Sequence, residues 1–362
     1  MNKKAPPQPQ LPAHGASVLP SVTVDSYNVE VEDDEGFVGD RASKGAFWGL
    51  VDKWRKPLSD AGEDPLGSKA SEDIGKKILV DMLSEGEPEA AALVLSAIEE
   101  FAQQLAYVIR RFMRLKDWKD TEAITVGGGF SGSRLGELAV ARCGLILRAE
   151  GTDISLDVIR HDPDEAGLLG AAHLLPAWML KGHDGILAVD VGGTNIRAGI
   201  VELNLGKSDD LAKARVVKSE LWRHGDEKDI GRDDAIDRLI EMLADLNDWA
   251  AKNKMDLAPV VGIGCPGIIH DDGSIARGGQ NLPGNWESSR FNLPRAVVEG
   301  LPQISGQETM VVMHNDAVVQ GLSQLPFMQK REHWAALTIG TGLGNVRFTN
   351  RNGKKPKKNG GD

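Results

Sequence analysis

Short apolar runs alternate with longer stretches of helical periodicity along most of the chain. The apolar runs predict strands at residues 22–31, 124–126, 145–148, 186–191, 260–264, 310–313 and 334–339. Apolar residues at helical spacing predict helices over residues 42–56, 88–116, 164–180 and 231–252. Strands that alternate with helices in this way indicate an α/β protein.

Proline and polar residues mark the expected ends of several elements. Pro57 should end the helix that begins near Ala42, and Pro176 lies close to the end of the alanine-rich helix over 164–180. Residues 1–20 are rich in proline and polar side chains, so we expect a disordered tail there. The polar, basic segment 351–362 should be frayed in the same way.

Length and composition narrow the class of protein. The 362 residues suffice for two domains, and 53 Asp and Glu against 42 Lys and Arg give a net charge of −11. This acidic balance argues against a nucleic acid or an anionic membrane as partner. We recognise no signal peptide and no apolar run of the ~18–20 residues that span a membrane. Cys143 and Cys265 are the only cysteines, which excludes a disulfide framework and a cysteine-rich zinc site and indicates a cytoplasmic protein.

Glycine is enriched, with 42 residues, and much of the excess lies in three clusters. The first is Asp190-Val191-Gly192-Gly193-Thr194-Asn195-Ile196-Arg197, which follows an apolar strand. Two glycines suit a tight hairpin with positive φ, whose backbone N–H groups can approach an anion. Asp190, at the strand end, is placed to hold Mg²⁺ directly or through water. The alternative is a plain β-hairpin in which Asp190 caps the turn.

The second cluster, Thr338-Ile339-Gly340-Thr341-Gly342-Leu343-Gly344-Asn345, repeats this pattern of a strand followed by glycines and a threonine. Two such loops in one chain suggest two clamps on one polyphosphate, one from each half of a cleft. Taken alone, the second cluster could equally be an ordinary glycine-rich hairpin.

The third cluster, Gly127-Gly128-Gly129-Phe130-Ser131-Gly132, lies between a strand and a helix. It satisfies G-x-G-x-x-G, and Glu150 follows about 20 residues later, as in the fingerprint of a dinucleotide-binding fold. The same pattern recurs at Gly262, Gly264 and Gly267 without a following helix, so it is weakly specific. A glycine turn here would also suit a nucleoside that lies flat against the backbone.

Asp316 is the candidate for the chemistry, because it ends the apolar strand 310–313 in His314-Asn315-Asp316 and begins a helix. A carboxylate there can accept a proton from a substrate hydroxyl while Asn315 bonds a neighbouring hydroxyl. The alternative is that Asp316 is only the N-cap of the helix.

The glycine-rich loop 264–294 offers further polar groups. Asn281 and Asn285 are candidates to bind a polyol, and Trp286 could stack on a sugar face or close a lid. The alternative is a surface loop with Trp286 in a core.

Six segments together resemble motifs of the ROK family (repressors, open reading frames, kinases) of bacterial sugar kinases, within the actin-like, RNase H-like ATPase fold. They are DVGGTNIR, GIGCPG, QNLPGNW, HNDA, LTIGTGLGN and VGGGFSGSR. The resemblance covers roughly residues 120–350 in pieces. It implies two RNase H-like lobes around a cleft, with ATP and Mg²⁺ as cofactors.

The resemblance also implies roles for individual residues. Asp316 would be the catalytic base, and Gly267, Asn281 and Asn315 would bind the sugar. The ATP-binding residues would be Asp190, Gly192, Gly193, Thr194, Asn195, Arg197, Thr338, Gly340, Thr341, Gly342, Gly344, Gly128 and Gly129, with Asp190 also on Mg²⁺.

Two departures from the family pattern stand out. The adenosine-side motif precedes the first phosphate motif, which resembles a circular permutation. On this interpretation residues 21–165 and 333–362 form the nucleotide-side lobe, 166–183 form a connecting helix and hinge, and 184–332 form the other lobe. The second departure is that the Glu-x-x-His sugar motif and the zinc-binding cysteine cluster are missing.

We therefore expect a cytoplasmic, ATP-dependent hexose kinase, glucokinase-like, and the resemblance implies a dimer or larger assembly. A non-catalytic sugar- or nucleotide-sensing protein is the alternative that the missing motifs favour. A nicotinamide-dependent enzyme built on residues 122–150 is a third hypothesis. A family repressor is disfavoured, because no helix-turn-helix pattern precedes the glycine motifs. The hexose, its reacting hydroxyl and the choice between ATP and polyphosphate stay open.

Overall fold

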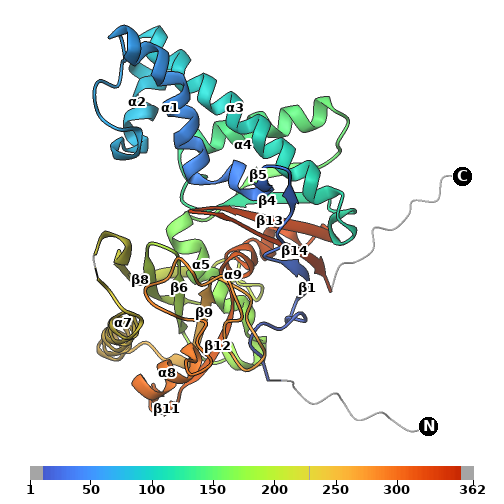
Figure 1. Ribbon diagram of the computed structural model, residues 1–362. Coiled ribbons are helices and arrows are strands. Elements are labelled where there is room, and N and C mark those ends of the chain that lie inside the picture. Colours follow the sequence, from blue (N-terminus) through green and yellow to red (C-terminus); the bar gives the residue numbers. More distant parts are fainter. Residues whose placement is uncertain (1–10, 228, 352–362) are drawn as a thin grey trace, which may run out of the picture.

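The computed structural model describes residues 11–227 and 229–351, and its framework is a pair of five-stranded sheets (Figure 1). The first sheet draws its strands from both ends of the chain. In spatial order it consists of β1 (Val22–Tyr27), β14 (Leu343–Asn350), β13 (His333–Ile339), β4 (Ala123–Gly127) and β5 (Ser155–Val158). The central strand β13 is antiparallel to β14 and parallel to β4.

The second sheet is built from one continuous part of the chain. Its order is β12 (Met310–Asn315), β9 (Leu257–Cys265), β6 (Gly185–Val191), β7 (Ile196–Glu202) and β8 (Arg215–Trp222). The central strand β6 is antiparallel to β7 and parallel to β9, so the two sheets share one arrangement of antiparallel and parallel strands. The predicted α/β class with two sheets is confirmed.

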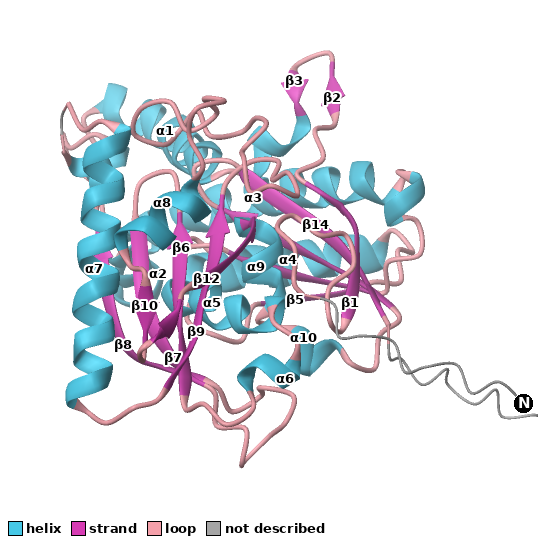
Figure 2. Ribbon diagram, turned by 90° about the horizontal axis from the view of Figure 1, so that it is seen from below, coloured by secondary structure: helices cyan, strands magenta, loops and turns pink. Residues whose placement is uncertain are grey.

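Helices cover the outer faces of the sheets and fill the space between them (Figure 1). Above the first sheet lie α1 (Lys44–Ala61), α2 (Lys76–Glu85), α3 (Pro88–Met113) and α4 (Arg134–Ala149). The layer between the sheets contains α5 (Pro163–Ala171) and α9 (Asp316–Leu322). The short helices α6 (Ala177–Leu180) and α10 (Leu325–Met328) are labelled in Figure 2. The outer face of the second sheet carries α7 (Arg232–Lys252) and α8 (Leu293–Gly300).

Two small hairpins lie outside the two five-stranded sheets. The pair β2 (Glu32–Asp33) and β3 (Gly36–Phe37) projects from the body between β1 and α1, as Figure 2 shows. The pair β10 (Gln303–Ile304) and β11 (Gln307–Glu308) follows α8.

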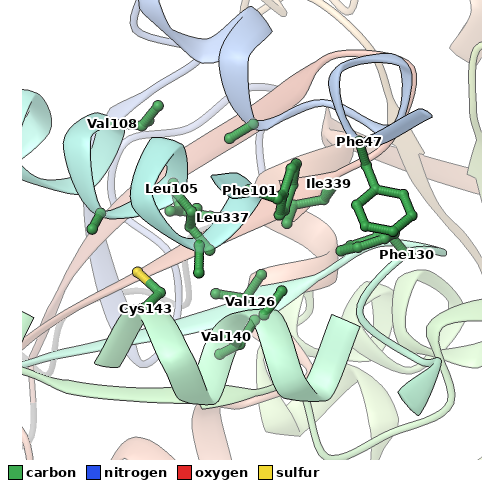
Figure 3. Packing of buried hydrophobic residues seen from close by; sticks show 14 of the residues in the cluster. Phe47, Phe101, Leu105, Val108, Val126, Phe130, Val140, Cys143, Leu337 and Ile339 are labelled. Carbon is green, nitrogen blue, oxygen red and sulfur yellow. The ribbon is translucent and has the colours of Figure 1, made fainter. Parts of the chain in front are cut away.

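Three apolar cores separate these layers. The first lies between the first sheet and helices α1 to α4. It holds an aromatic cluster in which the Phe130 ring centroid is 4.7 Å from that of Phe47 and 5.0 Å from that of Phe101 (Figure 3). Phe130 belongs to the third glycine cluster, so this packing fixes that loop against the helices.

Helix α3 passes the length and composition test for a membrane-spanning segment, the one helix that does so among residues 11–227 and 229–351. One apolar face of the helix, which runs from Leu93 to Phe112, is buried in the first core against α1 and α4. The burial of this face accounts for its apolar character, as in the core helix of a globular domain.

Several predicted boundaries are wrong. Pro57 lies inside α1, which continues to Ala61 and ends at Gly62 with φ of 80°. Residues 145–148 belong to α4, because Val140, Cys143 and Leu147 are buried at helical spacing. The helix expected over 164–180 is broken: α5 ends at Ala171 and α6 begins after Pro176.

The segment 11–20 differs from the expected tail. The backbone N–H of Gly15 donates to the carbonyl of Met313 at 2.9 Å, and the Met313 N–H donates to His14 Nδ1 at 3.1 Å. Leu19 is buried in the core between the sheets. These contacts hold the segment along β12, whereas residues 1–10 and 352–362 lie outside the described part of the chain.

Helices α5 and α9 pack backbone to backbone between the sheets. A Cβ placed on Gly170 would lie 1.7 Å from the carbonyl oxygen of Val319, closer than any real contact. Helix α5 also contacts β6 and β9, and α9 contacts β13 and β14. The separation of the two sheets therefore depends on a glycine at position 170.

We predict that Gly170→Ala destabilises the protein by about 2 kcal/mol or more, because the methyl group forces α5 away from α9. Thermal unfolding of Gly170→Ala should be compared with that of Gly49→Ala on α1, where a Cβ meets nothing within 4 Å. The control substitution should be neutral or stabilising by up to about 1 kcal/mol, since alanine favours helix more than glycine does. Equal melting temperatures for the two variants would contradict the proposed role of the contact.

Candidate active site

A cavity of about 780 Å³ lies between the two sheets, and all three glycine clusters line it. This volume is within the usual range for small-molecule sites. The sequence-predicted residues that line it are Asp190, Gly192, Gly193, Thr194, Asn195, Arg197, Gly267, Asn281, Asp316, Thr338, Gly340, Thr341, Gly342, Gly344, Gly128 and Gly129. The candidate residues that do not line this cavity are Asn285, Trp286 and Asn315.

The first and second clusters are hairpins at equivalent places in the two sheets. The first joins β6 to β7, and the second joins β13 to β14. A Cβ placed on Gly193 would lie 3.1 Å from Asn281 Cβ and 3.8 Å from Thr341 Oγ1, so the two hairpins face each other closely.

The expectation of positive φ in the first hairpin is wrong. Neither Gly192 nor Gly193 has a positive φ. Glycine is needed at position 193 for space, because a larger residue would meet Asn281. The turn is closed by a hydrogen bond from the Gly192 N–H to the Asn195 carbonyl at 2.8 Å, and His224 Nε2 lies 3.0 Å from the Gly192 carbonyl.

The third cluster packs directly on the second. Gly128 has φ of 87°, and a Cβ there would lie 2.3 Å from the carbonyl oxygen of Ile339. Only glycine satisfies both the backbone angle and the close approach. The loop after β4 is thereby held beside the hairpin after β13.

Asp316 is the first residue of α9 and lines the cavity. Burial, and then the nearby carboxylate of Asp190, raise its pKa from an ordinary 3.8 to about 7. A carboxyl group with such a pKa can exchange a proton near neutral pH. The N-cap of α9 is Asn315, so the alternative that Asp316 is only a helix cap is wrong.

Asn315 is buried and does not line the cavity. Its Oδ1 accepts hydrogen bonds from the N–H groups of Ala317 and Val318 at 3.0 and 3.3 Å. Its Nδ2 donates to the carbonyl of Gly267 at 3.0 Å. Both ends of the amide are thus engaged, which differs from the expected contact with substrate, and Asn315 instead ties Asp316 to the loop at Gly267.

The loop after β9 contributes fewer groups than expected. Asn281 lines the cavity together with Gln280, whereas Asn285 does not line it and accepts from the Glu287 N–H through Oδ1 at 3.0 Å. Trp286 is 1% exposed and donates through Nε1 to the Pro283 carbonyl at 2.7 Å. The interpretation of Trp286 as a core residue is therefore the correct one.

Several of the side chains that line the cavity near the first turns of α5 and α9 are charged. Arg197 forms an ion pair with Asp164 at the start of α5, and its Nη1 lies 3.8 Å from Asp190 Oδ2. Burial raises the pKa of Asp190 above its ordinary value, while Arg197 opposes this shift. Gly167 makes room for the carboxylate, since a Cβ there would lie 2.5 Å from Asp190 Cγ.

The carboxylates of the cavity suit Mg²⁺, which phosphate oxygens and water would also bind, better than a metal ion whose ligands are all protein side chains. In the part of the chain that the structure describes, no group of three or more His, Cys, Asp or Glu residues is close enough to hold an ion. Asp190 and Asp316 both line the cavity. Mg²⁺ commonly binds to one or two carboxylates and completes its shell with phosphate oxygens and water.

Sequence reasoning missed several polar residues that line the cavity. They are Asn28, Glu30, Glu32, Asp40, Lys44, Lys76, Asp164, Gln280 and Gln320. Most lie in the N-terminal third, where no motif marks them, and Asn28, Glu30 and Glu32 follow β1, which joins the sheet of β13. Glu30, in the segment after β1, also pairs with Arg277 at 3.3 Å.

Comparison with known proteins supports the resemblance seen in the motifs. The chain is 29% identical to glucokinase from Thermotoga maritima over 159 residues, which is 44% of this chain and 43% of that protein. The chain thus aligns with less than half the length of this relative. The resemblance to a sugar kinase is confirmed, and the circular permutation stays a prediction. No family model matches the chain.

Likenesses to solved structures are weaker. The Listeria monocytogenes protein Lmo2764, provisionally named an N-acetylmannosamine kinase, is 20% identical, with a TM-score of 0.30, and the match covers 46% of this chain and 47% of that one. A PPX-GPPA enzyme from Aquifex aeolicus is 12% identical, with a TM-score of 0.27, and the match covers 67% and 86% of the two chains. These scores are too low to carry an argument.

We predict that Asp316→Asn stabilises the protein increasingly as the pH rises from 5 to 8. A carboxyl whose pKa is raised on folding stabilises the native state only at low pH, and this stability is lost as the pH passes from about 4 to about 7. Asparagine carries no such cost, so its advantage should reach about 1 kcal/mol or more at pH 8.

Thermal unfolding at pH 5 and pH 8 measures this difference. The matched control is Asp248→Asn, at an exposed position on α7. The prediction fails if the advantage of Asp316→Asn over wild type is the same at both pH values.

Proposed function

We propose that the protein is an ATP-dependent kinase that phosphorylates a hydroxyl group of a hexose. The observation that carries the proposal is the meeting of two glycine hairpins and Asp316 at a single cavity. The similarity to glucokinase supports the same conclusion for the part of the chain that it covers.

In this proposal the phosphate chain of ATP lies between the two facing hairpins. Backbone N–H groups near Gly193 and Gly342 stabilise negative charge on the transferred phosphoryl group. Adenosine lies near Gly128 and Gly129, beside the second hairpin. Mg²⁺ held by Asp190 would neutralise charge on the phosphate oxygens.

Asp316 acts as the general base toward the sugar hydroxyl. Its carboxylate accepts the hydroxyl proton as the oxygen attacks, and the raised pKa matches this task near neutral pH. Asn281 and Gln280 offer amide groups to the other hydroxyls of the ring. Asn315 is a positioning residue, because it bonds the first turn of α9 and the Gly267 carbonyl.

We also propose that the order of segments is a circular permutation of the sugar-kinase arrangement. Both sheets have the same strand pattern, but the first sheet takes β1 from the N-terminal part and β13 and β14 from the C-terminal part. On this view residues 21–165 with 333–362 form the nucleotide-side lobe, and 184–332 form the other.

Two other hypotheses, a dinucleotide-binding enzyme and a non-catalytic sugar sensor, have unequal support in this chain. A dinucleotide site on residues 122–150 needs an acidic residue at the end of the next strand. Glu150 instead follows α4 and forms an ion pair with Arg110 at 2.7 Å, so the residue that the fingerprint assigns to the ribose does not end a strand. A non-catalytic sugar sensor remains the second candidate, supported by the absence of the Glu-x-x-His motif from the sequence.

We expect the wild-type protein to consume ATP in the presence of a suitable hexose, and Asp316→Asn to reduce kcat by about 10²–10⁴. ATP–Mg²⁺ should still raise the melting temperature of the variant, because the hairpins are unchanged. A coupled ATP-consumption assay over a panel of hexoses makes the measurement, with Asp248→Asn as control. ATP binding without turnover of any hexose by wild type would favour the sensor.

The pH dependence of the reaction offers a separate test of Asp316. We expect kcat/KM to rise between pH 6 and pH 8 with a midpoint near 7, since only the ionised carboxylate can accept the proton. A rate that is flat across this range, with binding of ATP also unchanged, would exclude Asp316 as the titrating base.

A further inference from the structure

Two lysines reach the cavity from helices that carry none of the glycine motifs. Lys44 is the first residue of α1 and Lys76 is the first residue of α2, and both line the cavity. These helices lie above the first sheet, whereas the residues assigned to ATP so far come from the loops after strands (Figure 1). The two lysines therefore need a separate explanation.

Each lysine is attached to one of the loops assigned to ATP. The backbone N–H of Lys44 donates to the carbonyl of Gly340 at 2.9 Å, which fixes the start of α1 on the second hairpin. The Nζ of Lys76 donates to the carbonyl of Gly129 in the third cluster. Both residues thus begin their helices beside loops that we assign to the nucleotide.

The buried side chain of Arg55 connects α1 to the segment that leads into α2. Arg55 on α1 is paired with Asp64 at 3.1 Å, and both side chains are 8% exposed. The Arg55 guanidinium also donates to Ser71 Oγ at 2.6 Å and to the carbonyls of Gly67 and Lys69 at 3.0 and 2.7 Å. These bonds fix the connection that leads into α2, and hence the place of Lys76 relative to Lys44.

The positive charges of Lys44 and Lys76 destabilise the protein unless an anion is bound near them. Burial and the neighbouring charge of Lys44 lower the pKa of Lys76, although Asp164 acts in the opposite direction. Asp164 is already engaged with Arg197. Both lysines also occupy the first position of a helix, where the helix dipole disfavours a cation, and neither first turn contains an acidic residue.

We propose that Lys44 and Lys76 bind the phosphate chain of the nucleoside triphosphate, as a cationic clamp opposite the first hairpin. This inference rests on the proposed function. The phosphate chain is the polyanion expected between the loops at Gly340 and Gly129, and its charge would offset the repulsion between the two ammonium groups. The clamp assigns a binding role to α1 and α2.

Binding measurements separate a phosphate clamp from a structural role. We expect Lys76→Met and Lys44→Met each to raise the Kd of ATP–Mg²⁺ by about 10- to 100-fold, the usual effect of losing a charged hydrogen bond. Inorganic tripolyphosphate should lose affinity similarly, whereas adenosine should change less than about twofold. Calorimetric titration of each variant with the three ligands gives these values.

Matched controls are available on the same helices. Lys56→Met on α1 and Lys77→Met on α2 remove exposed lysines that do not line the cavity, and they should bind all three ligands as wild type does. The ligand-free melting temperature of Lys44→Met should equal or exceed that of wild type, because the repulsion between the ammonium groups is relieved, whereas Lys76→Met also loses the bond to the Gly129 carbonyl.

Each outcome bears on a different conclusion. Unchanged Kd values for ATP and tripolyphosphate in Lys44→Met and Lys76→Met overturn the clamp, even if wild type phosphorylates a hexose. Equal losses for adenosine and ATP also overturn it, because the lysines would then only support the loops. The two variants could lose affinity for ATP and tripolyphosphate but not for adenosine, while the wild-type protein phosphorylates no sugar. That result would uphold the clamp and overturn the proposed kinase activity.

Discussion

The contact between α5 and α9 is the constraint on which the cavity depends. Each helix follows the edge strand at the parallel side of its own sheet, and the two backbones meet where Gly170 faces the Val319 carbonyl. This close packing brings both sheets together with their glycine hairpins on the same side. Asp316 is the first residue of α9 and Asp164 is the second residue of α5, so the same contact also sets the distance between these two acidic groups.

The electrostatics of the cavity follow from this geometry. Burial is the main reason that the pKa values of Asp190 and Asp316 are raised, and the charge of Asp190 raises the pKa of Asp316 further. A protein that needed only stability would gain by replacing one of them with a neutral residue. Their presence is explained if cations and a phosphate chain enter the site, because opposite charges then compensate groups that the fold alone leaves in conflict.

Local chemistry made part of the site predictable. The hairpins at Gly192 and Gly340 are predictable because an apolar strand leads into glycine and threonine at each. Asp316 is predictable as a site residue because it lies at the end of a strand. Other features depend on tertiary structure. The short apolar run at 145–148 is compatible with strand or helix, and burial of Cys143 and Leu147 on one face decides for helix. The amide of Asn315 was assigned to substrate because its bonds to α9 and Gly267 are invisible in the sequence, and Lys44 and Lys76 reach the cavity only through the packing of α1 and α2.

The mixed origin of the first sheet has a consequence for biosynthesis. Strands β14 and β13 lie between β1 and β4, so β1 and β4 are not joined in one sheet until residues 333–350 have been translated. The second sheet is complete once residue 315 has emerged and can form early. During synthesis the first 160 or so residues therefore contain strands whose partners β13 and β14 have not yet been made. Nascent chains with such unpaired strand edges most readily aggregate or recruit chaperones.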